Sequence, residues 1–292
     1  MFDVPFPGLR PFQRGDAEIF FTPASRLAPS LEKLSAQGLL LLTGPTQCGK
    51  SSMVNSGLID ALECGLAPGC GGSWIVLELL TSANPYVSLI DAIRRHRHDV
   101  SVNWGDSVSL AAELRQIESG FSDFLARLFP PREESGLLLV MDNLDSFLDQ
   151  TPPDLLDEFI GHLIGAAQTT PRLLHSVLVM EDDNFGKLSK YDNLTRYANI
   201  GLHLLPRPDV VQVQASIEGP VRLFGGFLEP GLLQRLIMDL KDLKAPLPTL
   251  QSVLQKLWTQ ASGFNRETKP VLTLDNYLRL VKEQFHGKLS PG

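Results

Sequence analysis

The amino-acid sequence predicts an α/β fold in which a parallel five-stranded sheet, with helices on both faces, precedes a smaller helical domain. Continuous apolar runs, typical of strands buried on both faces, recur as far as residue 205. The segments between these runs carry apolar residues at helical spacing, which predicts crossover helices. Beyond residue 209 the apolar runs stop and only the helical spacing continues. With 292 residues, 43% of them hydrophobic, the chain is long enough to bury a large core.

Each predicted element follows from one such run or one such spacing. The predicted strands span residues 38–44, 73–80, 136–142, 175–180 and 200–205. The predicted crossover helices lie within residues 85–98, 109–129 and 153–168. With a boundary near Pro206, we expect an N-terminal segment over 1–25, a sheet domain over 26–206 and a helical domain over 207–292.

Charge and cysteine content narrow the class of protein. The chain has 26 Lys and Arg residues against 33 Asp and Glu residues, a net charge of -7, which disfavours nucleic acid as a partner. It shows neither a signal peptide nor a run of about 20 apolar residues, so we expect no membrane span and a cytoplasmic location. Three cysteines fit a reducing compartment, and Cys64 and Cys70 lack the second ligand pair of a zinc site.

The first predicted strand leads into a glycine-containing loop, "GPTQCGKS", which fits the pattern G-x-x-x-x-G-K-[ST] between a strand and a helix. Gly44 and Gly49 let the backbone turn so that successive N–H groups face phosphate oxygens. Lys50 is predicted to reach the β and γ phosphates, and the Ser51 hydroxyl to bind Mg²⁺. The predicted nucleotide-binding residues are Gly44, Pro45, Thr46, Gln47, Cys48, Gly49, Lys50, Ser51 and Ser52. The predicted ligand is a nucleoside triphosphate.

A second apolar run, "LLLVMD", ends at an acidic residue where open α/β sheets place their ligands. Asp142 is predicted to be the acidic ligand of Mg²⁺ and a catalytic residue. Asp145 is predicted to orient the attacking water or to accept its proton. The alternative for both residues is a structural role, as a strand end or as a cap in a turn-rich segment.

Several segments, in this order along the chain, resemble the novel STAND NTPases, a branch of signal-transducing P-loop ATPases related to AAA+ proteins. They are "FPGLRPFQRGDAEIFF", "GPTQCGKSSMVNSGL", "LLLVMDNLDSF", "SIEGPV", "APLPTLQSVLQKLW" and "LTLDNYL". The resemblance implies ATP or ADP with Mg²⁺ as cofactors and places Pro220 at the nucleotide. It also implies a switch in which nucleotide controls docking of the helical domain, with protein partners or homo-oligomers formed on activation.

The chain departs from the family at several positions, among them Ser146, where the family has a second acidic residue. The Gly and Arg that the family places near the nucleotide base are Thr22 and Pro23 here. A Glu that follows the family's acidic strand end is replaced by Asp145, and an Arg after the fourth strand is replaced by Glu181. A carboxylate beside a polyphosphate repels it. We therefore predict an ATP-binding switch with slow or impaired hydrolysis.

Two alternatives stay open. The first is a degenerate scaffold that acts by protein–protein interaction, with weak or no nucleotide turnover. The second is a small-molecule phosphotransferase, which is disfavoured because the basic run "RRHRH" at 94–98 is the one candidate for an acceptor phosphate pocket.

Overall fold

The structure is a computed structural model that describes residues 4–67, 72–96, 106–116, 120–130, 135–169, 174–241, 243, 246–262 and 269–284. The chain divides into two compact units, each built from separate segments of sequence. The sheet unit comprises Ala28–Pro45 and Ala61–Leu205. The helical unit comprises Met1–Leu27, Thr46–Asp60 and Pro206–Gly292. The predicted division at residues 25 and 206 stays a prediction.

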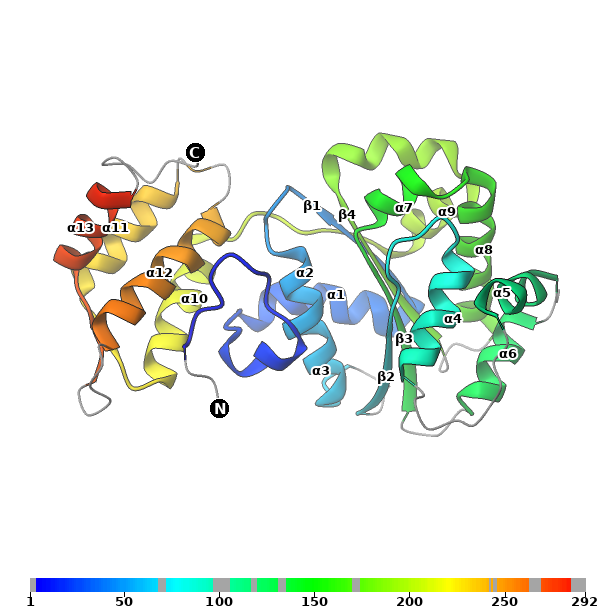
Figure 1. Cartoon of the computed structure of the whole chain (residues 1–292), viewed down its shortest axis with the longest axis horizontal. Coiled ribbons are helices and arrows are strands. Elements are labelled where there is room, and N and C mark those ends of the chain that lie inside the picture. Colours follow the sequence, from blue (N-terminus) through cyan, green and yellow to red (C-terminus); the bar gives the residue numbers. More distant parts are fainter. Residues whose placement is uncertain are drawn as a thin grey trace. The chain divides into compact units, whose positions relative to one another are not determined.

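A five-stranded parallel sheet forms the centre of the sheet unit (Figure 1), as the sequence predicts. Its strands are β1 (Leu39–Gly44), β2 (Ser73–Glu78), β3 (Ser135–Asp142), β4 (Leu174–Glu181) and β5 (Leu202–Leu204). They lie in the order β2-β3-β4-β1-β5. The carboxyl ends of β1, β3 and β4 therefore meet at one edge of the sheet.

Helices cover both faces of this sheet, as predicted from the two-sided burial of its strands (Figure 1). On one face, Leu41, Leu139 and Leu178 share a buried core with side chains of α4 (Pro85–His96), α8 (Pro153–Thr169) and α9 (Asp192–Gly201). On the other face lies α1 (Ala24–Gln37), where the Ser30 hydroxyl is 2.6 Å from Nδ1 of His203 in β5.

Shorter helices complete the sheet unit. They are α5 (Ser107–Gln116), α6 (Gly120–Leu128), α7 (Leu144–Gln150) and the 3₁₀ segment η3 (Asp182–Lys190). The stretch 109–129, predicted to be helical, corresponds to α5 and α6, and residues 117–119 between them lie outside the described residues.

The helical unit contains four longer helices, namely α10 (Val210–Leu223), α11 (Pro230–Leu240), α12 (Pro246–Ser262) and α13 (Leu274–Gln284). Its core joins Ile217, Leu254 and Trp258 to Phe6 of the N-terminal segment. The unit also holds the 3₁₀ segment η1 (Arg14–Ile19), the four-residue helix α2 (Lys50–Met53) and the π-helical segment η2 (Val54–Leu58). From η2 the chain continues into α3 (Ile59–Glu63).

One prediction for this region was wrong, because strands do occur beyond residue 209. β6 (Phe227–Leu228) pairs in parallel with β7 (Val271–Leu272). Two residues are too few to show a repeated period-two pattern, so this pair has no signal in the sequence. Among the described residues, no helix is both long enough and apolar enough to cross a membrane.

We expect Gly201→Ala to destabilise the sheet unit and Gly165→Ala to stabilise it. A Cβ atom at Gly201 would lie 2.5 Å from the backbone oxygen of Leu39, which no side-chain rotation relieves, and overpacking of this kind costs about 1–3 kcal/mol. At Gly165, inside α8, an added Cβ meets nothing within 4 Å. Alanine there should add about 0.5–1 kcal/mol through helix propensity. Urea unfolding of both variants checks the opposite signs; equal effects would contradict the packing of α9 on β1.

Candidate functional site

The loop between β1 and α2 has the backbone that a phosphate-binding turn requires. Gln47 has φ of 60° and Gly49 has φ of 96°, both in the left-handed region. A non-glycine residue at positive φ is uncommon, and such strain clusters at binding sites. Gly49 is also the N-cap residue of α2, whose first N–H groups have no partner inside the helix. The sequence motif therefore coincides with a tight turn that ends at a helix N-terminus, where anions bind.

The two residues after Gly49 are those predicted to contact phosphate and metal. Lys50 is the first residue of α2 and is only 8% exposed, which is unusual for a lysine. Ser51 is half-buried beside it, and Cys48, between Gln47 and Gly49, is buried. The structure thus brings the predicted loop residues from Thr46 onward into one turn of the helical unit.

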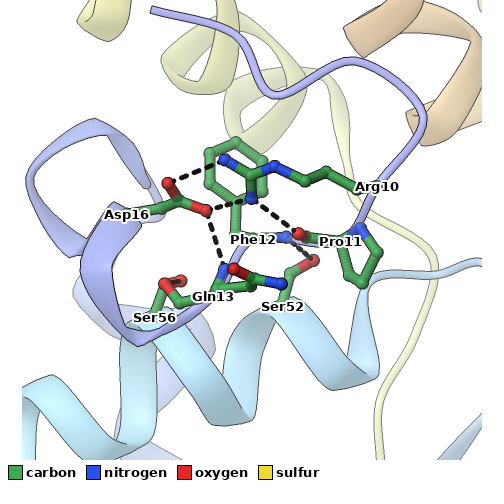
Figure 2. Close-up of polar contacts among 7 residues, drawn as sticks. All are labelled: Arg10, Pro11, Phe12, Gln13, Asp16, Ser52 and Ser56. Carbon is green, nitrogen blue, oxygen red and sulfur yellow. Dashed lines mark hydrogen bonds and ion pairs between the residues drawn. The ribbon is translucent and has the colours of Figure 1, made fainter. Parts of the chain in front are cut away.

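The N-terminal segment binds directly to the helix that follows the loop, as Figure 2 shows. The Phe12 N–H donates to Oγ of Ser52 over 3.1 Å, and Oγ of Ser56 donates to the Gln13 carbonyl over 2.7 Å. These contacts fix "RPFQ" alongside α2 and η2. Ser52, predicted to bind nucleotide, uses its hydroxyl as an acceptor for this segment.

An ion pair closes the same segment on itself. Arg10 Nη2 donates to Oδ1 of Asp16 over 3.0 Å, and Nη1 pairs with Oδ2 (Figure 2). The Gln13 N–H donates to Oδ2 of Asp16 over 2.8 Å. Burial acts to raise the pKa of Asp16, but the hydrogen bonds from Arg10 and Gln13 outweigh it and lower that pKa below its usual range. Arg10 therefore serves the fold of the segment.

The sheet unit carries the predicted acidic residues at the carboxyl edge of its strands. Asp142 is the last residue of β3 and pairs in register with Val179 of β4. Glu181, at the end of β4, pairs in register with Gly44, the first residue of the loop motif. Strand β4 separates β1 from β3, so Glu181 lies between the strand ends that bear Gly44 and Asp142.

Asp145 makes hydrogen bonds through both carboxylate oxygens. Oδ2 accepts from the backbone N–H of Glu181 over 3.0 Å, and Oδ1 accepts from Nδ2 of Asn184 over 2.7 Å. Asp145 lies in α7, so these bonds tie α7 to the end of β4 and the start of η3. Asp145 therefore has a structural role that differs from the cap considered from the sequence, and its role as a base stays a prediction.

Three further positions named from the sequence lie in the helical unit. Thr22 and Pro23 are half-buried ahead of α1, and Pro220 is buried inside α10. A Cβ at Gly219, next to Pro220, would lie 2.2 Å from Cγ of Phe21. The N-terminal segment therefore packs closely on the "SIEGPV" element of α10. Of the cysteines weighed for zinc, Cys64 is exposed, and Cys70 lies outside the described residues.

Sequence reasoning missed one residue that contacts the loop. Arg26, in α1, donates from Nη2 to the Cys48 carbonyl over 3.1 Å. It lies three positions after Pro23 in the sequence, and no motif marks it.

Several solved structures are similar to this chain. The Aeropyrum pernix ORC2 protein in its ADP form is 15% identical, with a TM-score of 0.61, over 95% of this chain and 70% of that one. A Walker-type ATPase of Pyrococcus abyssi is 14% identical, with a TM-score of 0.55, over 96% and 77% of the two chains. CDC6P from Pyrobaculum aerophilum is 14% identical, with a TM-score of 0.57, over 90% and 72%. At these identities the likeness establishes the fold. No curated protein matches the chain in sequence.

The parallel sheet and the turn at Gly49 belong to a fold that this chain shares with the Walker-type ATPase and the ORC2 protein. The family model Novel STAND NTPase 1 matches residues 5–288. The chain belongs to this family, which confirms the resemblance drawn from its motifs.

Proposed function

We propose that this protein is an ATP-binding switch of the STAND type, with slow hydrolysis, in which bound nucleotide controls docking of the helical domain and assembly with protein partners or further copies. The observation that carries the proposal is the left-handed turn at Gly49 followed by the buried Lys50. A buried lysine and a tight turn that ends at a helix N-terminus each favour a nearby anion. Phosphate is the ligand that both features favour.

The residues proposed to hold Mg²⁺ carry the oxygen donors that this ion prefers. Ser51 would supply a hydroxyl oxygen and Asp142 a carboxylate oxygen, and Mg²⁺ prefers oxygen ligands of this kind. When bound, Mg²⁺ neutralises charge on the β and γ phosphates. Lys50 would bind the same phosphates, and the backbone N–H groups of the turn would orient them. Asp145 would contact the attacking water, although its bonds to Glu181 and Asn184 hold it in place.

Pro220 is proposed to carry the nucleotide state to the helical domain. It is buried in α10 next to Gly219, whose neighbour is the Phe21 ring. A ligand shifts such a docking equilibrium only through different affinities for the two states.

We place the protein in the cytoplasm. Aeropyrum pernix ORC1 was solved in complex with DNA, whereas the net charge of -7 makes nucleic acid a poor partner for this chain.

Titration calorimetry with ATP and with ADP, each with Mg²⁺, tests the proposal beside size-exclusion chromatography. We expect both nucleotides to bind and the elution volume to change with the nucleotide. Binding without any change of assembly would contradict the switch.

We expect Lys50→Ala to lower ATP affinity tenfold to a hundredfold. The substitution removes a charge-assisted contact worth about 1.5–3 kcal/mol. The fold should persist, because alanine is favourable in a helix and Lys50 is the first residue of α2. Lys187→Ala is the matched control, because Lys187 pairs with Asp149 at the surface. This variant should bind ATP with the affinity of the parent protein. Unchanged ATP affinity in Lys50→Ala would show that the phosphates do not bind at this loop.

A protein-interaction scaffold is the second candidate function. The observation that favours it is that the hydrogen bonds of Ser52 and Asp145 serve the fold. This function predicts no heat of ATP binding and the same assembly with and without nucleotide.

A further inference from the structure

Arg26 joins three parts of the helical unit through one guanidinium group. Nη2 donates to the Cys48 carbonyl over 3.1 Å and to the Pro206 carbonyl over 3.0 Å. Nη1 donates to Oε1 of Gln212 over 2.5 Å. Burial lowers the pKa of Arg26, with Asp209 acting in the opposite direction, yet a guanidinium stays charged at neutral pH. The three acceptors lie in the phosphate loop, at the start of the segment that enters α10, and in the first turn of α10.

The bond to Cys48 sets the direction of the peptide group that follows it. In a trans peptide the C=O of one residue and the N–H of the next point in opposite directions. Because the Cys48 carbonyl points at Arg26, the Gly49 N–H points away from it. That N–H belongs to the turn proposed to bind phosphate, so Arg26 fixes the orientation of one of its donors.

The bond to Gln212 belongs to the cap that starts α10. The Asp209 side chain accepts from the Gln212 N–H over 2.8 Å, and Oε1 of Gln212 accepts from the Asp209 N–H over 3.1 Å. This is a capping box, and Arg26 shares its Oε1 acceptor. A shift of the α10 N-terminus would therefore displace the Arg26 guanidinium, which donates to the Cys48 carbonyl.

The loop also lies close to α12 of the helical unit, independently of Arg26. A Cβ built on Gly49 would lie 3.2 Å from Cδ1 of Leu247, in the first turn of α12. The turn is therefore linked to α10 by the hydrogen bonds of Arg26, and it lies close to α12 at Leu247.

We propose that Arg26 is a positioning residue that couples phosphate binding at the Gly49 turn to the N-terminus of α10. The proposal rests on the proposed function, because it concerns the same nucleotide site. Phosphate would hold the Gly49 N–H in the direction that Arg26 already favours, and the same guanidinium would then hold Pro206 and the α10 cap more firmly. Loss of phosphate would loosen both together.

Hydrogen exchange with and without Mg²⁺-ATP, combined with calorimetry, tests this coupling on the full chain. In the parent protein we expect ATP to slow exchange in residues 46–50 and in residues 206–216. In Arg26→Ala we expect affinity for ATP to fall roughly threefold to tenfold. ATP should then protect 46–50 alone. A purely structural Arg26 would lower stability but leave the ATP-dependent protection of 206–216 intact.

Variants of the partner residue make the test independent of Arg26 itself. Gln212→Glu keeps an acceptor for Arg26 and should keep the coupling, whereas Gln212→Met removes it and should lose the coupling. Arg222→Ala is the matched control on the same helix, because Arg222 is 77% exposed and pairs with Glu218 within α10. If Arg26→Ala fails to fold, the Gln212 pair decides the question.

Two results would overturn the coupling alone. In the first, the parent protein binds ATP, and the Arg26→Ala variant binds ATP with the same affinity and shows the same ATP-dependent protection of residues 206–216 from hydrogen exchange. The other is an Arg222→Ala variant that loses protection as Arg26→Ala does. A parent that binds no ATP would overturn the proposed function, and the coupling with it.

Discussion

Single-turnover hydrolysis of ATP by this protein is expected to be slow, well below the ~1–10³ s⁻¹ common among enzymes. A general base must come within about 2.6–3.2 Å of the water whose proton it accepts. Asp145 is one methylene shorter than the family's Glu, and hydrogen bonds to Glu181 and Asn184 hold both of its oxygens. Poor placement of the base forfeits much of a contribution worth about 10²–10⁴ in rate.

Two substitutions separate the causes of the slow rate. Asp145→Glu should increase the rate, because the longer side chain extends the carboxylate beyond its present partners. Glu181→Arg should tighten ATP more than ADP, because it replaces a repulsion at the terminal phosphate by an attraction. If Glu181 also blocks the reaction, the double variant should be faster than either single one. A parent that turns over several times per second, or an Asp145→Glu variant slower than the parent, would exclude Asp145 as the limiting base.

Acid should destabilise the sheet unit through His175, with a total loss of about 3 kcal/mol. His175 is 2% exposed in β4, with its ring 5.0 Å from that of Trp74. Burial lowers the pKa of His175 from 6.5 to about 4. The unfolded chain therefore binds this proton first, so stability is complete above about pH 7 and falls as the pH drops from about 6.5 to 4. By pH 5 the loss should be about 2 kcal/mol.

Urea unfolding between pH 7.5 and pH 4.5, compared with His175→Leu, isolates this effect. The parent should lose stability relative to the variant over that interval, because leucine takes up no proton. The half-buried His203 gives the control, since His203→Gln should retain the acid sensitivity of the parent. If the free energies of unfolding of the parent and of His175→Leu differ by the same amount at every pH, His175 can be protonated in the folded chain.

The sequence predicted those parts of the fold that local patterns encode. The apolar runs located β1 and β3, and the loop motif located the turn at Gly49, because each pattern reports its own backbone. Asp145 was assigned from its position near Asp142, and its bond to Asn184 depends on how distant segments meet. Hydrogen bonds of this kind have no signature in a single sequence.

Arg26 illustrates the same limit more strongly. Its acceptors lie 22, 180 and 186 positions away in the chain, so neither motif nor periodicity connects them. The pair β6 and β7 was missed for a different reason, because each strand has two residues and so covers a single period of the strand pattern. Packing decides both features.

The helical unit combines Met1–Leu27 with Thr46–Asp60 and Pro206–Gly292, whereas the sheet unit ends at Leu205. On the ribosome, the sheet unit has its whole sequence available before the helical unit does. The ring of Phe6 can pack on the ring of Trp258 only after Trp258 has been synthesised; in the folded protein the two ring centroids are 6.4 Å apart. Contacts so distant in sequence form late and leave apolar surface uncovered meanwhile. During synthesis Phe6 therefore lacks this aromatic partner until α12 has left the ribosome.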